Sequence, residues 1–166
     1  DDEGLAQNTL VVYSSDQGFY MGEHGWFDKR WIFEESLRTP MFARWPSVTK
    51  PGTVEKHIVS NVDYAETFLE AAGLPIPADM QGRVFLGEQS EPPRQYVFGA
   101  RDRCDETMFR FRTVRDARWR YIRNFMPERP FLQTNDYKER SYPVWNLIKE
   151  LGAAGKLTDW QKSFYL

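Results

Sequence analysis

The most constraining feature of the sequence is a short apolar run that stops abruptly at a polar turn. Leu10–Tyr13 is continuously apolar with two valines in its middle, and Ser14-Ser15-Asp16-Gln17-Gly18 follows at once. A short run of this kind is typical of a strand buried on both faces in a parallel sheet. Ligands in open α/β sheets collect just beyond the carboxyl ends of such strands. We therefore expect an α/β fold with a ligand site at this turn.

The side chains after this strand are suited to binding a divalent cation and an anion together. Asp16 and Gln17 offer a carboxylate and an amide oxygen, which are hard ligands suited to Ca²⁺ or Mg²⁺. The loop that follows contains His24, one of only two histidines, and then Lys29. A cation, a histidine and a lysine close together would form a pocket for a tetrahedral anion. This indicates hydrolysis or transfer of a sulfate or phosphate ester, while an Asx-type turn and a solvated lysine are the structural alternatives.

The composition argues against several other classes of function. The formal net charge of −2 gives no reason to expect a nucleic acid or an anionic membrane surface as a partner. No apolar run approaches the roughly 20 residues that a membrane-spanning helix needs. The single cysteine, Cys104, excludes an intrachain disulfide, and no pattern around it supports a nucleophile, so we expect a bystander thiol.

Hydrophobic periodicity and turn residues place the other elements. Residues 15–38 are expected to form a long loop with one helical turn around Trp31–Leu37. Strands are expected at Leu10–Ser14, Met41–Trp45, Tyr96–Ala100, Met108–Val114 and Arg118–Asn124, and helices at Ser60–Ala72, Tyr142–Leu151 and Thr158–Phe164. The stretch 84–95 is interpreted as a linker between a core part, 1–83, and a small α+β subdomain, 96–166.

The clearest helix, Ser60–Ala72, has start and stop signals as well as an apolar face. Ser60 and Asp63 form a capping-box-like start, and Gly73 stands where a C-terminal cap belongs. The apolar side chains that share one face are Ala65, Phe68, Leu69 and Ala72. Thr158 and Gln161 form a second capping pair, at the start of the last predicted helix.

Four ordered segments near the N-terminus resemble the sulfatases, members of the alkaline-phosphatase-like superfamily. They are NTLVVYSSDQG at Asn8–Gly18, GEHG at Gly22–Gly25, Lys29, and EESLRTP at Glu34–Pro40. The resemblance continues through Val62–Pro75, Met80–Arg83 and the hairpin-like Arg112–Phe125. It implies the C-terminal part of an alkaline-phosphatase-like α/β sandwich, joined to a small antiparallel-sheet subdomain with a C-terminal helix.

By this resemblance, Asp16 and Gln17 supply two oxygen ligands to a Ca²⁺ ion, with Mg²⁺ as the alternative. Gln17 stands where sulfatases usually have Asn or His, a mild departure that could alter the preferred metal. Lys29 and His24 are implied as catalytic residues that contact the sulfate and stabilise the departing oxygen. For His24, a place in a substrate subsite and a hydrogen bond that holds the loop are the alternatives.

The resemblance also implies roles for charged residues elsewhere. Arg101 and Arg103 would contact an anionic sugar, although alternating charges are more often a solvated turn. Glu34, Glu35 and Arg38 look like a buried structural charge network rather than catalytic groups.

The nucleophile of the family is expected to lie outside this chain. Sulfatases convert a Cys or Ser in a Cys/Ser-X-Pro-X-Arg motif to formylglycine, whose hydrate attacks sulfur. Cys104 is followed by Asp-Glu-Thr-Met, and we expect none of the serines to be followed by X-Pro-X-Arg. Asp1–Gln7 looks like the tail of a helix rather than the family's first metal-ligand pair. We therefore expect a C-terminal portion that is inactive without the N-terminal half of the same enzyme.

The substrate implied by the resemblance is a sulfated small molecule or glycan, as a sulfate ester or an N-sulfate. The family implies a periplasmic or secreted location. Two other functions remain open at this point. A phosphoesterase of the same superfamily would commonly use two metals with more His and Asp ligands, and a non-catalytic module would bind anionic sugars without turnover.

Overall fold

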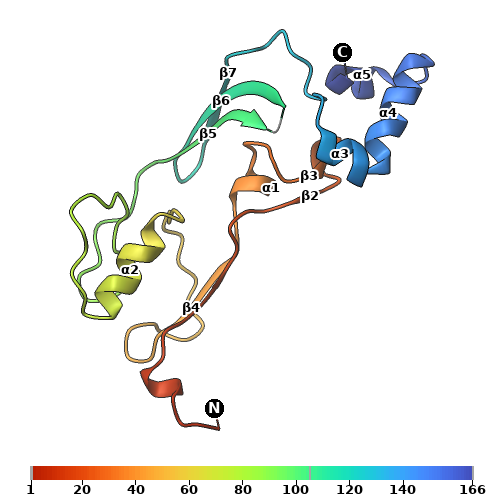
Figure 1. Ribbon diagram of the computed structural model, residues 1–166. Helices are drawn as coiled ribbons and strands as arrows, with labels where there is room; N and C mark the ends of the chain where they lie inside the picture. Colours follow the sequence, from red (N-terminus) through yellow and green to blue (C-terminus); the bar gives the residue numbers. More distant parts are fainter. Residues whose placement is uncertain (1, 105, 166) are drawn as a thin grey trace. The chain divides into compact units, whose positions relative to one another are not determined.

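The structure of the protein is a computed structural model that describes residues 2–104 and 106–165 (Figure 1). The chain divides into two compact units that interleave along the sequence. The first unit comprises Asp1–Gly18, Arg38–Val97 and Val114–Arg120, and the second comprises Phe19–Leu37, Phe98–Thr113 and Tyr121–Leu166. This division differs from the predicted domains 1–83 and 96–166, whose boundaries stay a prediction. The predicted helix tail begins at Asp1, which lies outside the described residues.

The elements agree with most of the predicted strands and helices. In the first unit they are η1 (Ala6–Asn8, a 3-10 helix), β1 (Val11–Ser14), β4 (Met41–Arg44) and α2 (Asp63–Ala71). The second unit contains β2 (Tyr20–Met21), η2 (Glu23–Gly25), β3 (Phe27–Asp28), α1 (Glu34–Leu37), α3 (Asp136–Ser141), α4 (Pro143–Ala153) and α5 (Asp159–Tyr165). Three longer strands, β5 (Val97–Cys104), β6 (Thr107–Arg115) and β7 (Arg120–Asn124), form one sheet in that order. Within the described residues, no helix combines the length and apolar character needed to cross a membrane.

Strand β1 forms a two-stranded antiparallel ribbon with β4, in which Val11 lies opposite Arg44 and Ser14 opposite Met41. The two predicted strands are confirmed, but parallel pairing and burial on both faces are wrong for the described residues. Val11 is 50% exposed and Tyr13 is 65% exposed. An apolar run indicates a strand that can be buried, whereas the direction of its neighbours is set by the rest of the fold.

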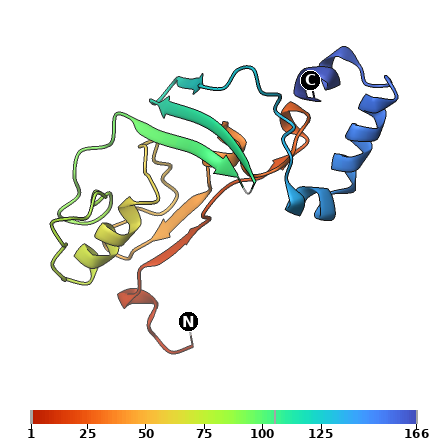
Figure 2. The same cartoon turned by 45° about the horizontal axis from the view of Figure 1, so that its top comes forward.

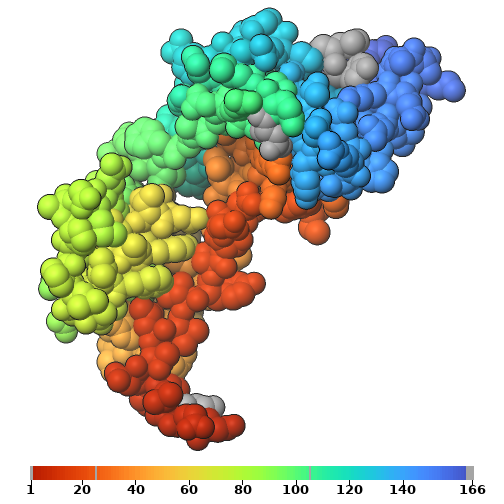
Figure 3. Space-filling model, viewed as in Figure 1, coloured from red at the N-terminus to blue at the C-terminus, as the bar shows by residue number. Residues whose placement is uncertain are grey.

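Helix α2 buries its polar face rather than its apolar one. Asp63, Glu66 and Thr67 are at most 3% exposed, whereas Phe68 is 42% exposed. The apolar face predicted for this helix is therefore the more exposed face within this chain. Figure 3 shows that the segment following the helix in sequence lies directly beside it.

The C-terminal end of α2 follows the predicted stop signal. Gly73 has a φ of 68°, and its N–H donates to the carbonyl oxygen of Glu70 at 2.9 Å. The N–H of Leu74 donates to the carbonyl oxygen of Leu69, also at 2.9 Å. These two bonds form a Schellman motif, whose left-handed residue is most easily a glycine.

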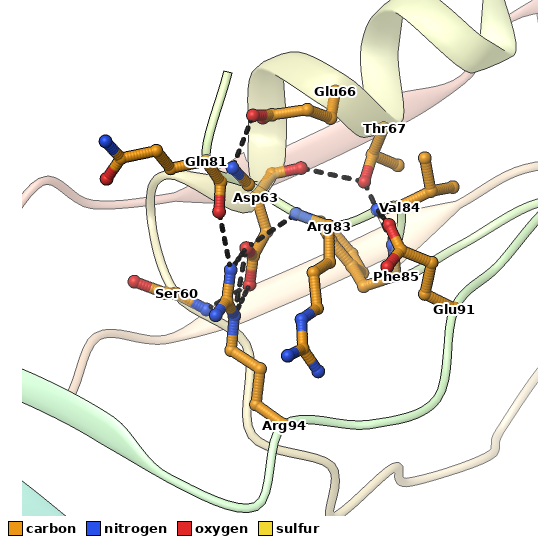
Figure 4. A network of polar contacts seen from close by, with 11 residues as sticks. Ser60, Asp63, Glu66, Thr67, Gln81, Arg83, Val84, Phe85, Glu91 and Arg94 are labelled. Carbon is orange, nitrogen blue, oxygen red and sulfur yellow. Dashed lines mark hydrogen bonds and ion pairs between the residues drawn. The ribbon is translucent and has the colours of Figure 1, made fainter. Parts of the chain in front are cut away.

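A network of hydrogen bonds joins the next segment to the polar face of α2 (Figure 4). The Asp63 carboxylate accepts hydrogen bonds from Nε of Arg94 at 2.9 and 3.0 Å, and Nη2 of Arg94 adds a further contact. It also accepts from the backbone N–H groups of Ser60 at 2.8 Å and Arg83 at 3.0 Å. The first of these is half of the predicted capping box.

Two further side chains of α2 extend this network. Glu66 accepts from the N–H of Gly82 at 2.5 Å, and Oγ1 of Thr67 accepts from the N–H of Phe85 at 3.1 Å. The stretch 84–95, interpreted as a linker from its composition, is thus partly bonded to the helix. The backbone N–H groups of Gly82 and Arg83, just before this stretch, donate to the buried carboxylates of Glu66 and Asp63, which compensates for the burial of these acidic side chains.

Replacing Gly82 with alanine is expected to lower the free energy of unfolding by about 1–3 kcal/mol, as for other overpacked sites. A Cβ atom at this position would lie closer than 3.0 Å to the Glu66 carboxylate and to the carbonyl oxygen of Val62, and the latter cannot rotate away. Urea denaturation of Gly82→Ala measures the loss. Gln81→Ala is the matched control, because the Gln81 side chain is exposed and its removal should change stability by less than about 0.5 kcal/mol.

In the second unit, strands β5, β6 and β7 lie side by side in one sheet (Figure 2). One face of this sheet packs on an aromatic core. Phe109 and Phe111 on β6 are 0% and 2% exposed, whereas the intervening Arg110 is exposed. This alternation is the period of a strand with one buried face. The buried cluster consists of Tyr20, Trp26, Trp31, Ile32, Phe109, Phe111 and Trp145.

Two parts of the second unit are not predicted by the sequence analysis. Strands β2 and β3 pair as a short antiparallel hairpin inside the region expected to be a loop, 15–38. Helix α3 was missed, although Asn135 caps it by accepting from the N–H of Lys138 at 2.9 Å. The predicted cap of α5 is confirmed, because the N–H of Thr158 donates to Oε1 of Gln161 at 2.9 Å.

Candidate functional site

The turn after β1 holds Asp16 and Gln17 through their backbone. Oγ of Ser15 donates to the carbonyl oxygen of Gln17 at 2.8 Å. Nδ2 of Asn61 donates to the carbonyl oxygen of Asp16 at 3.1 Å. The preceding Ser14 hydroxyl donates to the carbonyl oxygen of Pro40 at 3.0 Å, which anchors the end of the strand. The backbone of the turn is therefore fixed while its side chains stay available.

The donor set of this turn fits a hard divalent cation, but it is incomplete. The exposed Asp16 carboxylate has one side-chain partner in the described part of the chain, the Ser15 hydroxyl at 3.4 Å. Ca²⁺ takes six to eight oxygen ligands. Among the described residues no group of three or more His, Cys, Asp and Glu side chains could hold a metal. Asp16 and Gln17 can thus be part of a calcium or magnesium site whose other ligands come from elsewhere.

His24 lies in η2 with a φ of 54°, a left-handed conformation that is uncommon outside glycine. Its Nε2 is 3.2 Å from Oε1 of Glu35, and its ring stacks on Phe33 with 5.1 Å between centroids. The His24 side chain remains 47% exposed. Glu35, predicted as part of a structural charge network, therefore positions the imidazole, while the predicted network member Arg38 is exposed.

The loop around His24 is tied by its neighbours. The N–H of Met21 donates to Oε2 of Glu23 at 2.7 Å, and this bond and other backbone N–H contacts hold the pKa of the Glu23 carboxyl below its ordinary value. The N–H of Gly22 donates to the carbonyl oxygen of Trp26 at 2.9 Å, which closes the loop. His24 is therefore presented on a hydrogen-bonded turn.

Lys29 follows β3 directly and is half-buried. Its carbonyl oxygen accepts a hydrogen bond from the Ser36 hydroxyl. In the described part of the chain its ammonium group forms no ion pair. The preceding residue, Asp28, is 1% exposed and pairs with Lys138 of α3. The backbone of Lys29 is thus fixed on both sides while its charge remains available, a support that sequence reasoning missed.

The two candidate arginines of β5 have different surroundings. The Arg101 guanidinium lies over the Trp31 ring, 4.1 Å from its centroid, and burial lowers its pKa. Arg103 is exposed. The segment containing Lys29 also meets β5 at Cys104, whose Sγ accepts from Nη1 of Arg30 at 3.5 Å.

The structure groups the predicted site residues by unit. Asp16 and Gln17 belong to the first unit. His24 and Lys29, together with both arginines of β5, belong to the second. Within the second unit, Trp31 connects the Lys29 segment to Arg101.

One stretch corrects the expectation that the formylglycine motif is absent. Ser90-Glu91-Pro92-Pro93-Arg94 has the spacing Ser-X-Pro-X-Arg. Its arginine is bound to the buried Asp63, and Ser90 is exposed after a turn in which its N–H donates to Gly87 at 3.4 Å. The arginine of this match therefore has a structural role in the α2 network.

Residues 22–150 match the family model described as N-sulphoglucosamine sulphohydrolase, C-terminal. This range includes His24, Lys29, Arg101 and Arg103, whereas Asp16 and Gln17 precede it.

Three relatives are sulfatases. An ulvan-active sulfatase of Formosa agariphila is 36% identical over 168 residues, which cover 99% of this chain and 27% of the relative. An N-acetylglucosamine-6-O-sulfatase of Bacteroides thetaiotaomicron is 52% identical over 79 residues, or 48% of this chain and 14% of the relative. The extracellular sulfatase SULF-1 homolog of Drosophila melanogaster is 40% identical over 84 residues, or 50% of this chain and 8% of the relative. The chain thus spans about a quarter or less of the length of these relatives.

A solved structure gives the same result. The structure of BT4656 in complex with its substrate D-glucosamine-2-N,6-O-disulfate matches 96% of this chain and 37% of that chain, with a TM-score of 0.63 and 28% identity. The predicted fold class, the C-terminal part of an alkaline-phosphatase-like α/β protein, is confirmed by this likeness. The match over residues 22–150 and the similarity to sulfatases over nearly the whole chain establish its family. The chain belongs to the sulfatase family and contains its N-sulphoglucosamine sulphohydrolase-type C-terminal region.

Proposed function

We propose that the protein containing this chain hydrolyses sulfate esters or N-sulfates of carbohydrates. The observation that carries the proposal is the Lys29 ammonium group, half-buried beside β3 with its backbone fixed by Ser36 and with no ion pair in the described residues. A positive charge that stands on an anchored backbone and has no ion-pair partner among the described residues is suited to bind a sulfate oxygen. The sulfatase family match covers the loop in which it lies.

The metal site is proposed to include Asp16 and Gln17. Their oxygens fit Ca²⁺, with Mg²⁺ as the alternative, and the remaining ligands would come from other parts of the protein. A bound divalent cation would supply charge stabilisation for the sulfate oxygens. The hydrogen bond from Asn61 keeps the turn in place, so that the two side chains can bind without a backbone rearrangement.

Lys29 and His24 are proposed to act at the scissile bond. The Lys29 ammonium would neutralise the charge that develops on the departing oxygen. His24 would donate a proton or a hydrogen bond to that oxygen, and Glu35, whose Oε1 lies 3.2 Å from Nε2 of His24, would orient the imidazole. The formylglycine nucleophile is proposed to lie in another part of the same protein.

We also infer a sulfated amino sugar as the substrate class. The relatives include an N-acetylglucosamine-6-O-sulfatase and a structure bound to a disulfated glucosamine. Arg103 is exposed on β5 and Arg101 is half-buried with its guanidinium over the Trp31 ring, and both remain predicted sugar contacts. A periplasmic or secreted location is proposed from an extracellular relative.

Turnover by the complete gene product tests the proposed function. We expect release of sulfate from an aryl sulfate and from glucosamine 6-sulfate, with much slower release of phosphate from the matching phosphate esters. Faster phosphate release would support a phosphoesterase, and glycan binding without turnover would support a binding module. Mass spectrometry of the Ser90 peptide should show an unmodified serine, because a loss of two hydrogen atoms would place the formylglycine there instead.

The Asp16→Asn variant of the complete protein is expected to lose affinity for calcium by about tenfold or more, because removing a carboxylate ligand removes charge from the site. The readout is sulfate release as calcium is restored to chelator-treated enzyme. Asp79→Asn is the matched control, since Asp79 is exposed in a turn. Equal calcium dependence in all three proteins would remove Asp16 from the metal site.

A further inference from the structure

The second unit encloses a small pocket on the inner side of β5. Its lining includes Trp31, Arg101, Cys104, Lys138 and Trp145. The cavity has a volume of about 10 Å³. On this measure there is room for a single occupant of roughly the size of a water molecule, and none for a sulfate group or a sugar.

The pocket is rich in hydrogen-bond donors that have no acceptor. Nε1 of Trp31 and Nε1 of Trp145 are enclosed and unbonded in the described part of the chain, and these two residues are 2% and 5% exposed. Nε and Nη1 of Arg101 are enclosed and unbonded as well. Each buried unsatisfied donor costs about 1–3 kcal/mol, more when the group is charged. These four buried N–H groups belong to three residues that line the pocket, which favours an occupant that accepts hydrogen bonds.

The charges around the pocket are unbalanced. Lys138 is 2% exposed and is neutralised by Asp28, which is 1% exposed. Arg101 has no carboxylate partner of its own among the described residues. Its guanidinium lies over the rings of Trp31 and Phe109, but contact with a ring face leaves the N–H groups at its edge unbonded.

The pKa values of the two cations agree with this imbalance. Burial lowers the pKa of Arg101 against the opposing effects of Cys104 and Asp28, and burial lowers that of Lys138 against the opposing effect of Asp28. Both positive charges are therefore held in surroundings that disfavour them. A negative charge in the pocket would stabilise both.

We propose that this pocket binds a monatomic anion, chloride under ordinary conditions, beside the Arg101 guanidinium. A halide accepts hydrogen bonds without donating any, and it compensates the unpaired positive charge. A water molecule would fill the same volume, but it would leave the positive charge of Arg101 without a counter-charge. The bound anion would hold the Trp31 segment against β5 and α3.

Thermal unfolding of the complete protein tests this site without depending on its catalytic activity. The melting temperature is measured in sodium chloride, sodium bromide and sodium gluconate at equal ionic strength. We expect a saturable rise of about 2 °C or more with both halides relative to gluconate, whose anion is too large for the pocket. Equal melting temperatures in the three salts would contradict the proposal.

Crystals grown with sodium bromide locate the anion directly. We expect an anomalous peak within hydrogen-bonding distance of Nε or Nη1 of Arg101. Density for a water molecule without anomalous signal would overturn the proposal. This measurement uses the unaltered protein, so it stands even where a variant of the pocket fails to fold.

A matched pair of variants assigns the stabilisation to this pocket. Arg101→Leu is expected to abolish the difference between halide and gluconate. Arg110→Leu makes the same charge change on the exposed side of the neighbouring strand, where Arg110 is 51% exposed, and should keep the difference. A halide response that survives Arg101→Leu would place the anion elsewhere and contradict the proposal.

Discussion

Replacing Lys29 with alanine in the complete protein is expected to lower kcat for sulfate release by about 100- to 1,000-fold, the loss seen when one preorganised electrostatic contact to a developing negative charge is removed. The carbonyl oxygen of Lys29, not its side chain, accepts from Ser36. The substitution therefore removes the charge while leaving the loop anchored. The measurement is steady-state turnover of an aryl sulfate with calcium present in excess.

Two further variants separate the charge of Lys29 from its shape. Lys29→Arg retains the positive charge on a wider, planar group, so we expect partial recovery of kcat relative to alanine. Lys50→Ala removes an exposed lysine from the turn after β4 and should leave turnover within about twofold, as for a surface change away from the chemistry. If Lys29→Ala matched Lys50→Ala, the proposed contact with the departing oxygen would be wrong.

Local sequence signals predicted most of the element types in this chain. Gly73 ends α2 through a left-handed residue, and Thr158 and Gln161 cap α5, because these signals act over a few residues. The sulfatase family could also be recognised from the ordered segments around Asp16 and Lys29, because a motif consists of side chains that the site needs at particular positions.

Properties that depend on distant partners could not be predicted in this way. The buried polar face of α2 depends on donors from residues 82–94, so its own periodicity indicated the opposite face. Likewise, Asp28 pairs with Lys138, which lies more than a hundred positions later in the sequence. No local sequence pattern predicts this ion pair. The metal-ligand, catalytic and sugar-binding roles stay predictions, because their test requires the complete site.

The Asp63→Asn variant is expected to lower the free energy of unfolding at neutral pH by about 3–5 kcal/mol, the cost of breaking a buried ion pair on one side. The Asp63 side chain is 2% exposed and that of Arg94 is 18% exposed, so the arginine would keep its charge with little access to water. Urea denaturation measures the loss. Asp102→Asn breaks an exposed pair with Arg112 at 2.8 Å and should cost less than about 1 kcal/mol.

The pH dependence of this difference provides a second test of the same ion pair. Burial by itself would raise the pKa of the Asp63 carboxyl, but the hydrogen bonds from Arg94, Ser60 and Arg83 outweigh burial and hold it below its ordinary value of 3.8. A carboxyl whose pKa is lower in the folded state stabilises the fold above the unfolded-state value, and this contribution is lost as the pH falls through the folded-state value. The gap in unfolding free energy between the unaltered protein and Asp63→Asn should therefore be constant near neutrality and narrow below about pH 4. A gap that stayed constant on acidification would show that the Asp63 charge contributes nothing, and that only the shape of the side chain supports the segment bonded to α2.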